Sequence, residues 1–78
     1  MTEITLTYYG EVAEKTGKEQ ETVQLENIEI PEIMKYLEST YALNTKGIKI
    51  AVNHELATQD TQLKANDEIA ILSPFAGG

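Results

Sequence analysis

The last six residues of the sequence, Ser73-Pro74-Phe75-Ala76-Gly77-Gly78, form the segment best suited to chemistry. They carry no charged side chain, although 24% of the sequence is charged. Six extended residues reach up to roughly 20 Å, and two glycines at the tip can pass through a narrow channel. We therefore expect the segment to place the carboxylate of Gly78 in a distant active site, with Gly77 and Ala76 threading the channel. The alternative is a frayed terminus.

Other groups that could do chemistry are few. The sequence has one histidine, His54, and no cysteine, which excludes a cysteine nucleophile and disfavours a zinc site. His54 falls in a predicted turn and is interpreted as a surface residue rather than a base. The acidic pairs Glu19/Glu21 and Asp67/Glu68 are interpreted as solvated charge, since no EF-hand spacing is present. We expect no metal and no stably bound cofactor.

The charge balance limits the classes of partner that the chain is expected to bind. Thirteen acidic residues against six lysines give a net charge of −7. Arginine, which dominates bidentate recognition of phosphates and bases, is absent, so we expect no nucleic-acid binding. The acidity serves either solubility or steering toward a basic partner. No apolar run approaches the ~20 residues of a membrane helix and no signal peptide is visible, so we expect no membrane partner and a cytoplasmic location.

Hydrophobic periodicity predicts the elements that carry the tail. Alternation predicts strands over residues 3–9, 20–25, 47–53 and 68–72, and a short strand over 55–57. Residues 11–16 are predicted to form a short helix that ends at Gly17. A longer helix has Pro31 in its first turn, and its apolar face comprises Ile30, Ile33, Met34, Leu37 and Tyr41. Residues 58–64 are predicted to be a loop, with at most one helical turn, that places Leu63 in the core.

The order of these elements predicts the fold. A single amphipathic helix must bury its apolar stripe on a sheet. The economical arrangement is a mixed sheet of four to five strands with the main helix across one face and the first strand inside, parallel to the last. This α+β architecture is the β-grasp, or ubiquitin-like, fold. We expect one domain over residues 1–78, near the lower size limit for a self-sufficient core, with an extended tail at residues 73–78.

The last strand predicts a partner-binding surface beside the tail. If Ile69 and Ile71 pack under the helix, Leu72 lies on the open face of the sheet. Phe75 has no evident place in the core, so Leu72, Pro74 and Phe75 are expected to form an apolar anchor for a partner protein. The alternative is that Leu72 covers a sheet edge and Phe75 folds back on the domain.

Residues 50–78 resemble the small subunit of molybdopterin synthase, the MoaD type of the MoaD/ThiS family of ubiquitin-like sulfur carriers. The resemblance rests on the strand end Val52-Asn53, on Leu63, on the turn at residues 66–68 and on the tail at residues 74–78. The first half agrees more loosely in the order and length of its elements.

The sequence departs from the family pattern at several positions. Asn66 replaces a usual turn glycine, and Ser73 replaces the first of two prolines. Tyr9-Gly10 stands where an aromatic-alanine pair is usual, and the arginine common in the following helix is absent. These departures concern the partner contacts of the first helix rather than the terminal chemistry.

The resemblance implies a carrier role in two stages. An E1-like enzyme would adenylate Gly78 with Mg-ATP, and a sulfur donor would convert the adenylate to a thiocarboxylate. The carrier would then insert its tail into the large synthase subunit, within a heterotetramer, and donate sulfur to a pterin precursor for the molybdenum cofactor. The carrier would supply positioning and no catalytic group.

Three alternatives stay open. A carrier of the thiamine pathway would share the mechanism and differ in its acceptor. A ubiquitin-like modifier would share the activation step and form isopeptide bonds with lysines. A β-grasp interaction domain would carry the two glycines without using them.

Overall fold

The computed structural model describes residues 2–73, and its strands form one mixed sheet with the order β2-β1-β5-β3-β4. The elements are β1 (Thr2–Tyr8), α1 (Glu11–Thr16), β2 (Gln20–Leu25), α2 (Ile30–Tyr41), β3 (Lys49–Val52), β4 (Glu55–Leu56) and β5 (Glu68–Leu72). Strand β1 pairs antiparallel with β2 and parallel with β5, and β3 pairs antiparallel with both β4 and β5. The expected β-grasp arrangement, with the first strand inside the sheet and parallel to the last, is confirmed.

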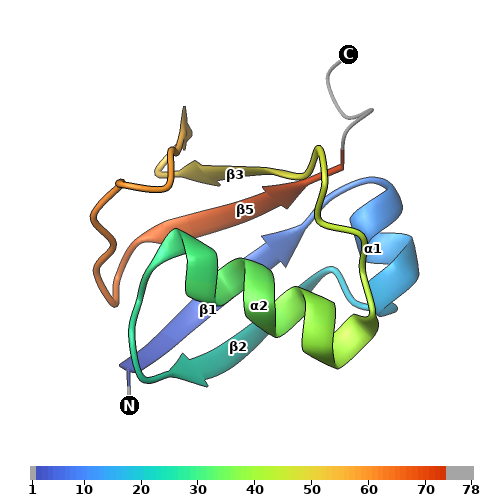
Figure 1. The fold of residues 1–78 in the computed structure, drawn as a ribbon, viewed down its shortest axis with the longest axis horizontal. Coiled ribbons are helices and arrows are strands. Elements are labelled where there is room, and N and C mark those ends of the chain that lie inside the picture. The colour runs from blue at the N-terminus through green and yellow to red at the C-terminus, as the bar shows by residue number, and fades with distance from the viewer. Residues whose placement is uncertain (1, 74–78) are drawn as a thin grey trace.

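Helix α2 lies across one face of the sheet and closes the core (Figure 1). Its buried side chains are Ile30, Ile33 and Leu37, and Met34 and Tyr41 pack partly buried beside them. The facing strands contribute alternate residues, namely Ile4, Leu6, Tyr8, Val23, Leu25, Ile50, Val52, Ile69 and Ile71. The period-2 and helical patterns of the sequence thus identify the core correctly. Neither helix of the described part is long and apolar enough to cross a membrane.

Both helices end on residues in the left-handed region. Gly17 has φ 74° and donates its N–H to the carbonyl of Ala13, as expected for a C-terminal glycine. Helix α2 ends at Ala42, whose φ of 54° is unusual for a residue with a Cβ. The N–H of Ala42 bonds to the carbonyl of Leu37, and the next side chain, Leu43, is buried. Burial of Leu43 offsets the backbone strain at Ala42.

The third strand is shorter than the predicted 47–53. Gly47 has φ 87° and Asn53 has φ 51°, and both values interrupt extended backbone. The fourth strand stops at Leu56, one residue short of the expected end. Residues 58–64 contain no helical turn, and Leu63 nevertheless packs partly buried against the core. The loop and the position of Leu63 are as predicted.

Asn53 and Asp67, which belong to the segments that resemble the family, join the turn after β3 to the turn before β5. The Asn53 side chain donates to Oδ1 of Asp67 (3.0 Å) and accepts from the backbone N–H of Glu68 (2.9 Å). The other carboxylate oxygen of Asp67 accepts from the N–H of Lys64 (2.8 Å). These two hydrogen bonds, that of Asn53 first, lower the pKa of Asp67. Asp67 is thus a partly exposed charge, as expected, and its carboxylate also organises the turn before β5.

Candidate functional site

The sheet face opposite α2 carries the candidate site. Ile69 and Ile71 are fully buried on the helix side, so Ala70 and Leu72 face the other way and are half-buried. The prediction that Leu72 lies on the open face is confirmed. Its role as a partner contact stays a prediction.

Four residues form an apolar surface at the carboxyl end of β5, which we call the exit patch: Tyr9, Ala51, Ala70 and Leu72. They line one shallow hollow together with Thr7, His54 and Glu68. Tyr9 is 47% exposed, one of the two large hydrophobic residues left exposed in residues 2–73. Chain position 73, where the tail is predicted to begin, follows directly on this patch.

Sequence reasoning missed three members of the exit patch, namely Tyr9, Ala51 and Ala70. The signal was available for Tyr9, because alternation over residues 3–9 places it on the face opposite Ile4. Its position beside Leu72 follows from the parallel pairing of Thr7 with Ala70, continued by a hydrogen bond from the Tyr9 N–H to the Ile71 carbonyl (3.1 Å). Ala51 joins them because it pairs with Ala70 across β3 and β5.

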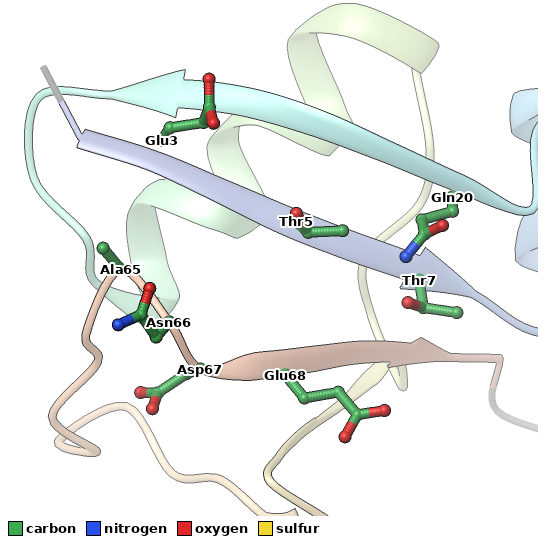
Figure 2. A pocket seen from close by; sticks show the side chains of 8 residues that line it. All are labelled: Glu3, Thr5, Thr7, Gln20, Ala65, Asn66, Asp67 and Glu68. Atoms are coloured by element: carbon green, nitrogen blue, oxygen red, sulfur yellow. The ribbon is translucent and has the colours of Figure 1, made fainter.

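Along β1 and β2, and at the start of β5, the open face is polar. Figure 2 shows Thr5, Thr7 and Gln20 beside the acidic side chains Glu3 and Glu68. The surface along β5 therefore changes from acidic at Glu68 to apolar at Leu72. A partner that covers both parts needs an apolar centre and basic or hydrogen-bonding groups at its rim.

His54 lies at the border between these two parts. It is 83% exposed in a tight turn, with φ 72°, and its Nε2 lies 3.2 Å from a carboxylate oxygen of Glu68. The interpretation of His54 as a surface turn residue is confirmed. Among residues 2–73, no group of three or more His, Asp or Glu side chains is placed to hold a metal ion.

A cluster of hydrogen-bonded polar side chains lies on the helix side of the sheet, around Glu21. This cluster shows that the interpretation of Glu21 as solvated charge is wrong. We call it the tyrosine cluster: Glu21 with Tyr8, Tyr36, Tyr41 and Lys18. The hydroxyl of Tyr8 donates to Oε2 of Glu21, as does that of Tyr41 at 2.5 Å, and Tyr36 donates to Oε1 at 3.1 Å. Lys18 lies 3.2 Å from the same Oε1. Because only 11% of the Glu21 side chain is exposed, it is not solvated charge.

The tyrosine cluster shifts the pKa values of Glu21, Tyr8 and Tyr36, each in the direction that favours its charge state at neutral pH. Burial alone would raise the pKa of Glu21, but the hydrogen bonds from Tyr41, Tyr8, Lys18 and Tyr36 outweigh it and lower the pKa. Burial and the Glu21 carboxylate raise the pKa values of Tyr8 and Tyr36. At neutral pH Glu21 therefore stays charged and the hydroxyls of Tyr8 and Tyr36 stay protonated. The hydrogen bonds of the cluster join α2 to β1 and β2.

Five predicted site residues, Pro74, Phe75, Ala76, Gly77 and Gly78, lie outside the described residues. Their roles stay predictions. The last described residue, Ser73, is buried.

The fold and the open apolar face define a ubiquitin-like β-grasp protein. The model of the ThiS family matches residues 6–78, and the chain belongs to this family of ubiquitin-like sulfur carriers.

Solved structures share the fold at low sequence identity. A Pyrococcus furiosus protein described as a candidate subunit 1 of molybdopterin converting factor is 16% identical with a TM-score of 0.80, over 95% of this chain and 99% of that one. Small archaeal modifier protein 1 of Haloferax volcanii is 19% identical with a TM-score of 0.79, over 95% and 99%. The complex of subunits 1 and 2 of molybdopterin-converting factor from Helicobacter pylori contains a chain that is 22% identical with a TM-score of 0.71, over 99% and 100%.

Proposed function

We propose that this chain is the sulfur carrier subunit of a molybdopterin synthase and that its chemistry takes place at Gly78. The observation that carries the proposal is the match of the ThiS family over residues 6–78, a range that contains the glycine pair. The exit patch adds support, because an exposed apolar surface beside position 73 suits a protein partner that receives the tail.

The first stage makes the terminal carboxylate reactive. A carboxylate is a poor electrophile, since its charge repels nucleophiles and oxide is a poor leaving group. Attack of the Gly78 carboxylate on the α-phosphate of Mg-ATP, in an E1-like activating enzyme, releases pyrophosphate and leaves an acyl adenylate. A persulfide sulfur then displaces AMP, and a second thiol cleaves the S–S bond to release the thiocarboxylate. ATP and Mg belong to the activating enzyme, and the carrier holds no cofactor of its own.

The second stage transfers the sulfur. The tail enters the large synthase subunit, which holds the pterin precursor, and the thiocarboxylate sulfur attacks a carbon of the precursor and displaces an oxygen leaving group. Water then hydrolyses the acyl–sulfur bond, which leaves the sulfur on the pterin and returns Gly78 to the carboxylate. The large subunit supplies the acids and bases, and the carrier supplies position. The chain is thus a non-catalytic subunit, and we propose a heterotetramer of two carriers and two large subunits. The Helicobacter pylori neighbour, a complex of subunits 1 and 2, supports a large-subunit partner.

A protein modifier is the second candidate. Structures of small archaeal modifier proteins from two organisms share the fold, with TM-scores of 0.79 and 0.77. A modifier would use the same adenylate of Gly78 and then acylate a lysine amine of a target protein. A thiamine-pathway carrier would differ from the proposed subunit only in the acceptor of its sulfur.

Reconstitution with a chemically prepared thiocarboxylate separates these candidates. The thiocarboxylated chain is mixed with the large synthase subunit and the pterin precursor, and sulfur in the pterin product is quantified. We expect transfer of sulfur from the thiocarboxylate and none from the carboxylate form or from a chain with one alanine appended after Gly78. Sulfur transfer to a thiazole precursor, or conjugates on lysines in cell extract with no pterin product, would contradict the molybdopterin role.

A further inference from the structure

Ser73 is buried although it lies beyond the last strand. Only 3% of its surface is exposed, whereas Leu72 before it is half-buried on the open face. Burial thus alternates over residues 71–73, so Ser73 continues the pattern of β5 and faces the helix side of the sheet. A small polar residue at this position needs a space that matches its size rather than a general apolar contact. We call this space the seat of Ser73.

The seat is made by Gly10. A Cβ placed on Gly10 would lie 3.1 Å from Oγ of Ser73 and 4.0 Å from its Cβ, so the glycine leaves the space that the serine fills. Gly10 has φ 61° and ψ −134°, a conformation that only glycine adopts at low cost. Its carbonyl accepts hydrogen bonds from the N–H groups of Ala13 and Glu14, so α1 holds the glycine in place. A side chain at position 10 would therefore both strain the backbone and push Ser73 out.

The seat lies directly after a backbone hydrogen bond that joins the ends of β1 and β5. The N–H of Tyr9 bonds to the carbonyl of Ile71 at 3.1 Å, one residue before Gly10 and two before Ser73.

We infer that Gly10 and Ser73 form a positioning pair that fixes where the tail leaves the domain and thereby sets how Gly78 is presented to the activating enzyme. This inference rests on the proposed carrier function. With Ser73 seated, five residues remain, and five residues span at most roughly 17 Å. The activating enzyme then has one residue fewer to order, because the tail starts from a fixed point, Ser73, beside the exit patch. Catalysis is sensitive to such placement, since a displacement of about 1 Å at the reacting atoms can cost 10²-fold in rate.

The kinetics of Gly78 conversion by the activating enzyme test this pair. Rates are measured by intact mass with Mg-ATP and a sulfur donor, at varied carrier concentration and well below the thermal midpoint of each variant. Ser73→Leu cannot enter the seat, and we expect kcat to fall at least tenfold while KM changes less than threefold, because the exit patch is intact. Ser73→Ala still fits the seat and should stay within threefold of wild type. Ser39→Leu, an exposed serine on α2, is the matched control for the added side chain and should leave kcat unchanged.

A double-mutant cycle tests the contact itself. Gly10→Ala should lower kcat at least threefold more in the wild-type background than in Ser73→Ala, because removing Oγ relieves the 3.1 Å approach. Equal effects in the two backgrounds would overturn the pairing. Conversion of Ser73→Leu with wild-type kcat would overturn the positioning role alone. A wild-type chain that is never converted, while a known carrier is converted in the same mixture, would overturn the carrier function and this inference with it.

Discussion

Tyr8 and Tyr9 are neighbours in the chain, yet the structure uses them in opposite ways. Tyr8 is 2% exposed on the helix side and donates its hydroxyl to Glu21, whereas Tyr9 is 47% exposed in the exit patch. The pleat of the strand separates them, since successive side chains point to opposite faces. The tyrosine cluster behind Tyr8 holds the helix to the sheet, and the exit patch around Tyr9 is available to a partner. Under the proposed function, stability and recognition are divided between the two faces of the sheet at the end of β1.

The largest expected effect is the loss of the Glu21 carboxylate. Glu21→Ala leaves the hydroxyls of Tyr8, Tyr36 and Tyr41 without their acceptor, and we expect the free energy of unfolding to fall by about 3 kcal/mol. Urea denaturation measures the change. Glu19→Ala, an exposed glutamate one residue before β2, is the matched control and should change little. Affinity of the folded Glu21→Ala chain for its partner should stay unchanged, and a large loss of affinity would break the division between the two faces.

Substitutions in the exit patch should have the opposite effects, namely weaker partner binding with a smaller loss of stability. We expect Tyr9→Ala and Leu72→Ala each to weaken binding to the large synthase subunit at least tenfold, which corresponds to about 1.4 kcal/mol. Isothermal titration measures the affinity. The thermal midpoint should fall less than in Glu21→Ala, because Tyr9 is 47% exposed and Leu72 is only partly buried. If either variant unfolds readily and binds normally once folded, the patch serves stability instead.

Acid should weaken the tyrosine cluster. Glu21 has a lowered pKa in the folded protein, so its contribution to stability is fully present above the ordinary glutamate pKa. That contribution is lost as pH falls from there through the lowered value. The free energy of unfolding should therefore decrease over this acidic range, and the decrease should be smaller in Glu21→Gln. Urea denaturation between pH 6 and pH 3 measures it, and identical slopes in the two proteins would contradict this assignment.

The smallest effect is expected at the border between the two parts of the open face. His54 and Glu68 are 3.2 Å apart, but their side chains are 83% and 61% exposed. Exposed pairs contribute little, so His54→Ala should leave the thermal midpoint unchanged within about 2 °C. A clear loss measured by calorimetry would show that the pair stabilises the turn at Asn53.

The sequence predicted the features that depend on local pattern. Alternation placed Tyr8 and Tyr9 on opposite faces and Leu72 on the open face, and Gly17 correctly marked the end of α1. The tyrosine cluster could not be predicted in this way. Its hydroxyl donors lie 13, 15 and 20 positions from Glu21, and their convergence depends on how α2 crosses the sheet. Periodicity assigned Tyr41 to the core but could not show that its hydroxyl needs a buried carboxylate.

The seat of Ser73 was out of reach for a related reason. Ser73 follows a strand and precedes a proline in the sequence, which suggests an exposed turn, and Gly10 looks like a simple strand end. Their contact requires the parallel pairing of β1 with β5. The resemblance to the family located both departures without showing that they touch.

Intact-protein mass spectrometry tests the central claim most directly. The chain is incubated with an E1-like activating enzyme, Mg-ATP and a sulfur donor, and its mass is followed beside that of a chain with one alanine appended after Gly78. The carrier role predicts a mass gain equal to the exchange of one oxygen for sulfur, localised to Gly78 and missing from the extended chain. An unchanged mass, in a mixture that converts a known carrier, would contradict the role and leave the exit patch as the surface of an interaction domain.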